Sequence, residues 1–306
     1  AARIAMAVLT VLVALGVRDL RQPQRAILRN YPIIGHLRFL LEFIRPELRQ
    51  YFIEGDSEAV PFSRSQRSLV YARANGDSDK RSVGSQLDFR AVGYEWLTHS
   101  MSPSEIESHD FRVAVGGSQC KQPYQISLFN VSAMSFGALS ANAIMALNKG
   151  AKKGGFAHDT GEGSISRYHR EHGGDLIWEI GSGYFGCRHA DGSFDPEKFA
   201  HSARDPQVKM VEIKLSQGAK PGRGGVLPGP KVTPEIAQAR GVPEGVDCVS
   251  PAAHSRFSTP LELMAFVQEL RTLSQGKPVG MKLCIGHPWE WFGIVHAMLH
   301  SGIRPD

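Results

Sequence analysis

The segment from Lys214 to Val232, KLSQGAKPGRGGVLPGPKV, combines residue types that suit an anion-binding site. It contains five glycines and three prolines together with lysines and a glutamine, and it follows the apolar segment VKMVEI. Glycines after a strand let the backbone approach a ligand closely, and lysines beside them supply positive charge. The segment therefore predicts a loop that binds a planar, phosphorylated or otherwise anionic ligand. Spacing alone leaves open a structural loop whose lysine reaches the rim of the fold and is solvated.

Two further segments could take part in chemistry. Glu162 lies between two glycines in TGEGS, where a carboxylate could orient an ammonium or iminium group or act as acid or base. The segment SAMSFG, which contains Ala133, Met134 and Ser135, is small and apolar and could lie under a flavin ring. The alternatives are a solvated loop charge for the first segment and an ordinary strand end for the second.

The cysteines and histidines show no spacing typical of a metal site. The cysteines at positions 120, 187, 248 and 284 are far apart in sequence, and the histidines form no HExxH motif. We therefore predict no metal in this chain, and reduced thiols in place of a disulfide framework.

Composition restricts the class of protein. The 306 residues are 42% hydrophobic and 21% charged, which allows one large α/β unit or two modest domains. The net charge of +5 slightly favours anionic ligands or membrane surfaces. The basic residues are scattered and form no recognised module, so we expect no nucleic-acid partner.

Strands and helices alternate from about residue 124. We expect strands in YQISLFNVSAMSFG, FAHDTGEGS, DLIWEIGSGYFG, VKMVEIKLSQGAKPG and PVGMKLCIGHP, and helices in SANAIMALNKGAKKGG and residues 258–275. Ser258 or Thr259 can cap the second helix, and Pro260 suits its first turn. This alternation predicts a parallel sheet, and the small and charged residues at its strand ends suit the catalytic face of a (β/α)8 barrel.

About five strands are expected where a barrel needs eight. We therefore predict a TIM barrel that is incomplete in this chain, over residues 111–306, in a fragment that continues beyond HSGIRPD. The alternative, an open doubly wound sheet, is weakly supported because no GxGxxG follows the first strand.

The N-terminal third is expected to differ from the barrel. Residues 1–20 are expected to form a hydrophobic helix, but the apolar run at residues 4–17 is shorter than the roughly 20 residues that span a bilayer. The run is either a buried or signal-like segment, or the remnant of a membrane anchor followed by the basic, cytoplasmic flank RDLRQPQR. Residues 21–110 are expected to form a helical and irregular, loop-rich cap.

Taken in order, SAMSFGALS, NKGAKKGGFAHDTGEG, GSGYFG, the segment from Lys214 to His254, and LRTLSQGKPVGMKL resemble the FMN-binding synthase domain of glutamate synthases. The resemblance is strongest to the shorter, membrane-tethered, stand-alone members, and its specific part covers about residues 124–287. It implies a TIM barrel that holds FMN and, in complete members, a [3Fe-4S] cluster whose ligands this chain lacks. It also implies that ammonia and 2-oxoglutarate give 2-iminoglutarate, which hydride from reduced FMN converts to glutamate.

The resemblance assigns roles to residues that could carry this reaction. Lys220 and Gln217 match positions close to the flavin and the imine. Glu162 matches the glutamate of the loop that links the synthase site to ammonia delivery. Lys214 and Arg240 match positions that hold the carboxylates of 2-oxoglutarate, and the guanidinium of Arg240 has the fork geometry for that contact.

The resemblance also assigns a cofactor site. Ala133, Met134 and Ser135 match the strand end that lines FMN, and Lys282 is a further flavin or substrate contact. Glu179 lies where the family tends to have a glutamine near FMN. A carboxylate there would repel a reduced flavin unless it is paired or protonated.

Two departures leave the exact reaction open. Val226 lies where glutamate synthases usually have a glutamine that helps to bind 2-oxoglutarate, and the chain has no amidotransferase module. We therefore expect an electron donor, either ferredoxin or a reductase subunit, and a separate amidotransferase as partners. The protein itself is expected either at the cytoplasmic side of a membrane, anchored by an N-terminal helix, or otherwise in the cytoplasm. The alternatives are a methylamine–glutamate N-methyltransferase-like subunit, another 2-oxo-acid amination, and a non-catalytic membrane-associated scaffold.

Overall fold

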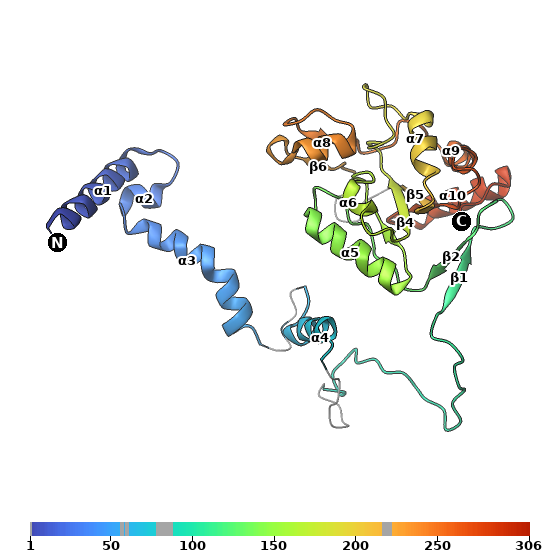
Figure 1. Cartoon of the computed structure of the whole chain (residues 1–306), viewed down its shortest axis with the longest axis horizontal. Helices are drawn as coiled ribbons and strands as arrows, with labels where there is room; N and C mark the ends of the chain where they lie inside the picture. Colours follow the sequence, from blue (N-terminus) through green and yellow to red (C-terminus); the bar gives the residue numbers. More distant parts are fainter. Residues whose placement is uncertain (1, 56–57, 59–60, 78–87, 216–221) are drawn as a thin grey trace. The chain divides into compact units, whose positions relative to one another are not determined.

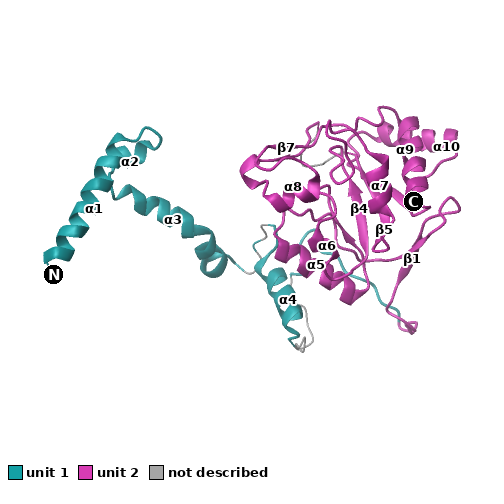
Figure 2. Ribbon diagram, turned by 45° about the horizontal axis from the view of Figure 1, so that its top comes forward, with its two compact units in different colours: residues 1–100 teal, residues 101–306 magenta. Residues whose placement is uncertain are grey.

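The computed structural model describes residues 2–55, 58, 61–77, 88–215 and 222–306. The chain divides into two compact units, residues 1–100 and residues 101–306 (Figure 2). The described part of the first unit is helical, whereas the second unit mixes helices and strands (Figure 1).

Helices make up the regular structure of the first unit. They are α1 (Ala2–Arg21), α2 (Ala26–Asn30), α3 (Gly35–Leu48) and α4 (Arg64–Asn75), with a π-helical turn η1 (Arg49–Ile53) after α3. The buried carboxylate of Asp19 closes the turn between α1 and α3, because it accepts a hydrogen bond from the Ile33 amide at 2.9 Å and contacts His36 Nε2 at 2.9 Å. No helix in the described residues has both the length and the hydrophobicity needed to cross a bilayer.

The second unit carries the strands. They are β1 (Arg112–Val115), β2 (Tyr124–Ser127), β3 (His158–Asp159), β4 (Leu176–Ile180), β5 (Val208–Lys214), β6 (Val226–Leu227), β7 (Cys248–Val249) and β8 (Val279–Lys282). The helices are α5 (Ala141–Gly154), α6 (Arg167–Arg170), α7 (Pro196–Ala203), α8 (Pro234–Arg240), α9 (Pro260–Leu273) and α10 (Pro288–Ser301), with the 3-10 turn η2 (Gly229–Lys231).

A four-stranded parallel sheet lies at the centre of this unit, in the order β3-β4-β5-β8. The predicted mixed α/β fold with a parallel sheet is confirmed. The strand expected over residues 124–137 is wrong as one element, because β2 pairs antiparallel with β1 and only Val131 bridges to β3. Asn130 separates the two parts, since its side chain donates to the Ser127 carbonyl and accepts from the Ala157 amide.

The two helices expected in this unit form where the sequence predicts them. Helix α5 begins after Ser140, whose hydroxyl accepts a hydrogen bond from the Ala143 amide, and ends at Gly155 in the left-handed conformation. Helix α9 begins with Pro260 after Thr259, which forms a reciprocal capping box with Glu262. The capping residue expected at position 258 or 259 is therefore Thr259.

The two faces of the sheet bury different side chains. One face packs against α7, α9 and α10 (Figure 1) through large apolar residues that are fully or almost fully buried: Trp178, Ile180, Phe199, Val211, Ile213, Phe266, Leu270 and Ile294. Each such side chain contributes roughly 1.5–3 kcal/mol by leaving water. On the opposite face, the apolar residues Ala157, Ile177 and Met210 pack together, and the β1–β2 hairpin covers them.

Candidate functional site

The hairpin-covered face of the sheet changes from apolar to charged towards the C-terminal ends of its strands. Side chains two residues apart on a strand point to the same face. Two residues beyond Ile177 on β4 is Glu179, and two residues beyond Met210 on β5 is Glu212. The register pairs these glutamates directly, in the same way that it pairs Ile177 with Met210. Asp159 ends β3, and its carboxylate lies close to those of the two glutamates.

Two lysines continue this charged layer. Lys282 ends β8, and its ammonium donates a hydrogen bond to Glu179 Oε2 and lies 3.7 Å from Glu212 Oε1. Lys214 ends β5, with its ammonium 3.4 Å from Glu162 Oε1 and 3.7 Å from Glu179 Oε1. A continuous chain of ion pairs thus lies at one end of the sheet. It runs in the order Glu162, Lys214, Glu179, Lys282 and Glu212.

Glu179 is the centre of that chain. Only 1% of this residue is exposed, and burial raises the pKa of its carboxyl group, whereas the ammonium groups of Lys282 and Lys214 act in the opposite direction. Burial alone would lower the pKa of Lys282, but the hydrogen bond to Glu179 and the surrounding carboxylates raise it. Glu179 is therefore paired with two ammonium groups. A carboxylate that is paired in this way can lie near an anionic ligand without strong repulsion.

The Glu162 loop packs directly on the segment from Ala133 to Ser135. A Cβ atom at Gly161 would lie 2.8 Å from the Ser135 amide nitrogen, and Gly161 has a positive φ of 63°. The Met134 amide donates to the Asp159 carbonyl at 3.1 Å, so the segment runs beside the end of β3. Only glycine at position 161 allows this close approach.

Arg240 reaches the back of the same loop from the last turn of α8. Its residue exposure is 6%, and its guanidinium donates to the Phe136 carbonyl at 3.3 Å and lies 5.2 Å from the centre of the Phe185 ring. A Cβ atom at Gly163 would lie 3.2 Å from Arg240 Nη2. Within the described parts of the chain, Arg240 forms no ion pair, and its Nε has no hydrogen-bond partner.

The structure thus brings most of the predicted site residues to one end of the sheet. Glu162, Glu179, Lys214 and Lys282 contact one another, and the segment from Ala133 to Ser135 adjoins them. Arg240 lies on the other side of Gly163. The predicted residues Gln217 and Lys220 lie outside the described residues. Val226 begins the short strand β6 and is 59% exposed.

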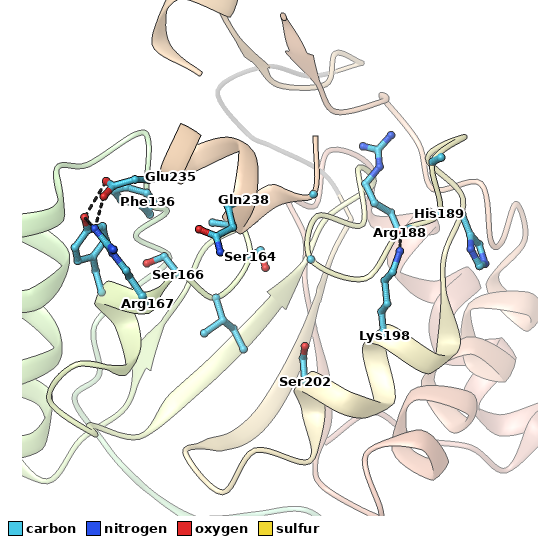
Figure 3. A pocket seen from close by; sticks show the side chains of 16 residues that line it. Phe136, Ser164, Ser166, Arg167, Arg188, His189, Lys198, Ser202, Glu235 and Gln238 are labelled. Atoms are coloured by element: carbon cyan, nitrogen blue, oxygen red, sulfur yellow. Dashed lines mark hydrogen bonds and ion pairs between the residues drawn. The ribbon is translucent and has the colours of Figure 1, made fainter. Parts of the chain in front are cut away.

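A separate cavity of about 710 Å³ lies between α6, α7 and α8 (Figure 3). Its rim carries Arg167, which pairs with Glu235, and Lys198, which donates to the Arg188 carbonyl at 2.8 Å. Within the described chain, no predicted site residue lines this cavity. Its cationic side chains are already engaged by a carboxylate or carbonyl, so the strand-end layer remains the stronger candidate for chemistry.

Comparison with known proteins places this chain in a family. A model of the conserved region in glutamate synthase matches residues 95–301. The chain belongs to the glutamate synthase family. It is 36% identical, over 331 aligned positions, to the glutamate synthase large subunit-like protein YerD of Bacillus subtilis (strain 168), covering 95% of this chain and 62% of YerD.

Other members of the glutamate synthase family match about half of this chain. Archaeal-type glutamate synthase [NADPH] of Thermotoga sp. (strain RQ2) is 39% identical over 157 residues, which are 51% of this chain and 28% of that protein. Archaeal glutamate synthase [NADPH] of Methanocaldococcus jannaschii is 36% identical over 158 residues, again 51% of this chain and 28% of that protein. The chain thus spans less than two thirds of the length of these relatives.

Sequence reasoning missed several members of the site in this glutamate synthase relative. Glu212 could have been found, because it precedes Lys214 by two residues on a predicted strand and must share its face. His254 also contacts the site, since its Nε2 lies 2.7 Å from the Lys214 carbonyl and its Nδ1 lies 3.1 Å from the Tyr184 hydroxyl. Burial lowers the pKa of His254, which favours the neutral ring that donates from one nitrogen and accepts at the other.

Proposed function

We propose that this protein is an FMN-dependent oxidoreductase of the glutamate synthase type. The reaction would be the reduction of 2-iminoglutarate, formed from 2-oxoglutarate and ammonia, to glutamate. Membership of the glutamate synthase family supports an oxidoreductase, and relatives named glutamate synthase support this reaction class. The observation that carries the proposal is the buried cation of Arg240 beside the Glu162 loop.

Arg240 needs an anion that the described residues do not supply. A guanidinium buried without a carboxylate is unfavourable by several kcal/mol, because desolvation is not offset by pairing. A substrate carboxylate would remove this penalty through two parallel hydrogen bonds, for which Arg240 still has its unpartnered Nε. Lys214, at the end of β5, offers a second cation, and a dicarboxylate could therefore be held by one carboxylate at each.

The strand ends also fit a flavin ring. Ala133 and Ser135 have small side chains and are partly exposed, and Gly161 and Gly163 let the Glu162 loop pack closely on this segment. Lys282 is the cation that would face the electron-rich edge of the ring, and Glu179 would hold that ammonium in place. When bound, FMN would supply the hydride.

The protein's own part in the reaction would be orientation and proton control. Lys214 and Arg240 would hold the substrate carboxylates, and Glu162 would orient the ammonia or iminium nitrogen through its paired carboxylate. We further propose that the parallel sheet belongs to a TIM barrel. Its apolar layer of Ala157, Ile177 and Met210, followed by a charged layer at the strand ends, has the layered interior typical of that fold.

The [3Fe-4S] cluster that the resemblance implies does not fit the described residues. A cluster needs several convergent thiolates, whereas no group of three metal-ligating side chains that includes a cysteine occurs in the described chain. A ferredoxin or reductase subunit as electron donor, and a separate amidotransferase as ammonia source, remain proposals for the intact protein.

A second candidate function rests on Val226. An apolar, exposed side chain at the position expected to help bind 2-oxoglutarate favours a different acceptor. The alternative is therefore a methylamine–glutamate N-methyltransferase-like subunit or another 2-oxo-acid amination.

The visible absorption spectrum of the intact purified protein distinguishes these functions. Bound flavin that is reduced and then reoxidises on addition of 2-oxoglutarate and ammonia would support the synthase reaction. Flavin that ignores 2-oxoglutarate would favour the second candidate, and absence of flavin would favour a scaffold. Lys220→Ala should abolish turnover without loss of fold, and retained turnover would contradict the assignment of that residue.

We also propose that the first unit contacts the cytoplasmic face of a membrane. Ile4, Met6, Leu9 and Val13 on α1 are more than half exposed, and the helix ends with basic residues. Apolar side chains beside arginines suit a surface of anionic lipid. Co-sedimentation with vesicles that contain phosphatidylserine should weaken in a Leu9→Asp, Val13→Asp variant, and unchanged binding would contradict the proposal.

A further inference from the structure

The charged layer holds more carboxylates than cations. Asp159, Glu179 and Glu212 each offer an oxygen within 4.8 Å of the others. Lys282 neutralises one of these three, and Lys214, which contacts Glu179, is shared with a fourth carboxylate in the neighbouring loop. If every carboxyl group were ionised, four negative charges would face two positive charges in a mostly buried site. Such an excess is strongly unfavourable in a low-dielectric interior.

Asp159 is the carboxyl group that lacks a cation. It is 6% exposed, and within the described residues no ammonium or guanidinium pairs with it. Its Oδ1 accepts a hydrogen bond from the Gly161 amide at 2.9 Å. Burial and the neighbouring charges of Glu179 and Glu212 raise the pKa of Asp159 well above its usual range.

A proton resolves the excess better than a metal ion. Three carboxylates at this distance resemble a divalent cation site, but the ammonium of Lys282 already contacts Glu179 and lies 3.7 Å from Glu212. A metal ion at the same point would face that ammonium and would have to displace it. A proton on Asp159 needs no such displacement. A carboxylate oxygen of Glu212 lies within 4.8 Å of Asp159, and the buried Glu212 Oε1 has no hydrogen-bond partner in the described residues.

We propose that Asp159 and Glu212 share one proton, and that this pair takes up a further proton from solvent when an anion binds Lys282. An anion that pairs with Lys282 weakens the contacts of its ammonium with Glu179 and Glu212. Lys214 still contacts Glu179, whereas Glu212 has no second cation among the described residues. Protonation of a carboxylate to a carboxylic acid then offsets one negative charge of the bound anion, and no bond in that anion changes. The identity of that anion, a flavin or a dicarboxylate, rests on the proposed function, whereas the shared proton does not.

Infrared spectroscopy of the intact protein as purified tests the shared proton. A protonated carboxyl group gives a carbonyl stretch distinct from that of carboxylates, and this band should shift in heavy water. Asp159→Asn should remove the band, because an amide keeps the hydrogen bonds of the acid without a titratable group. Glu212→Gln should shift the band, whereas Glu269→Gln, which changes a surface carboxylate paired with Arg256, should leave it in place.

Three results would overturn the shared proton. They are the absence of a carboxylic acid band, a band that survives Asp159→Asn, and stoichiometric retention of Mg²⁺, Mn²⁺ or Zn²⁺ that Asp159→Asn abolishes. Thermal denaturation gives a second measure that does not depend on assigning a band. A pKa raised in the folded state makes stability fall as pH rises above the ordinary pKa of aspartate, and Asp159→Asn should remove this fall.

Calorimetry with 2-oxoglutarate as the probe tests the proton uptake. The apparent binding enthalpy should depend on the ionisation enthalpy of the buffer, with about one proton taken up for each ligand bound. The double variant Asp159→Asn, Glu212→Gln should lose this dependence, and equal uptake in both proteins would overturn the coupling. A failure of 2-oxoglutarate to bind would count against both the proposed function and the coupling, while the infrared result would still decide the shared proton.

Discussion

Lys214 and Lys282 are register partners at the C-terminal ends of β5 and β8, so two ammonium groups leave the sheet side by side. Both contact the buried carboxylate of Glu179, which thereby bridges two neighbouring strand ends. Each lysine has one further carboxylate partner, Glu162 for Lys214 and Glu212 for Lys282. The strand register and the contacts with Glu179 hold both ammonium groups at one site. Removal of either lysine should therefore change the stability of the fold.

Lys282→Met should destabilise the fold by roughly 2–3 kcal/mol. The cost should lie below the roughly 3–5 kcal/mol of a fully buried pair, because the Lys282 side chain is 36% exposed. The double variant Lys282→Met, Glu179→Gln should recover most of this loss, since Glu179, the more deeply buried of the two carboxylate partners of Lys282, is then neutral. Denaturant unfolding at neutral pH measures both, with Lys209→Met as a control because its pair with Asp175 is longer, at 3.8 Å, and more exposed. Equal effects at positions 282 and 209 would contradict the importance of burial.

Arg271→Met should destabilise the second unit far more than Arg256→Met. The Arg271 side chain is 1% exposed and binds both the Asp306 carboxylate, at 2.8 Å, and the Arg304 carbonyl. Its loss would leave that buried carboxylate unpaired, at a cost of roughly 3–5 kcal/mol. Arg256 pairs with Glu269 on the surface, where such a pair contributes about 1 kcal/mol or less. The midpoints of urea unfolding should separate the two variants clearly, and similar midpoints would refute the expectation.

The sequence predicts local structure well where one short pattern determines it. The Ser-Thr-Pro segment before α9 contains its own cap, so the start of this helix is readable. The expected strand at residues 124–137 fails because Asn130 forms hydrogen bonds on both sides, and one of them joins it to residue 157. A hydrogen bond between residues so far apart in the sequence cannot be predicted from the local sequence pattern.

The candidate site is predictable to a similar extent. Family resemblance and position at strand ends bring Glu162, Lys214 and Lys282 to the same place. Asp159 is missed because its strand has only two residues, too few to show alternation of faces. The neighbours of Arg240 include Phe136, 104 residues earlier in the chain, so its lack of a carboxylate partner is visible only in three dimensions.

Acid should destabilise the second unit through His158 and His169. Both rings are fully buried, and burial lowers the pKa of each from 6.5 to about 4, with the charge of His169 also lowering that of His158. The unfolded chain therefore takes up protons first, so stability is fully present above pH 6.5 and falls as the pH drops towards 4. The difference of about 2.5 pH units corresponds to about 3 kcal/mol for each ring by pH 4.

His158→Leu offers a direct measurement of this effect. The ring of His158 has no hydrogen-bond partner in the described residues, so an apolar side chain of similar size should be tolerated at neutral pH. Free energies of unfolding between pH 4 and pH 8 should show a shallower acid decline for the variant than for the parent. Parallel declines would mean that His158 does not titrate in this range.

Arg240→Met should separate stability from ligand binding. The substitution removes a buried cation that has no carboxylate partner, so the free protein should lose little stability and could gain some. The same variant should lose measurable affinity for a dicarboxylate such as 2-oxoglutarate, because one carboxylate loses its bidentate partner.

The matched variant Arg240→Lys tests geometry at constant charge. Lysine keeps a cation near the Phe136 carbonyl but cannot form two parallel hydrogen bonds with a carboxylate. Its affinity for 2-oxoglutarate should fall roughly tenfold or more, which corresponds to about 1.4 kcal/mol. Thermal denaturation and calorimetry on the three proteins give both quantities. If Arg240→Met instead unfolds the protein and Arg240→Lys binds like the parent, the guanidinium is structural and the proposed substrate contact is wrong.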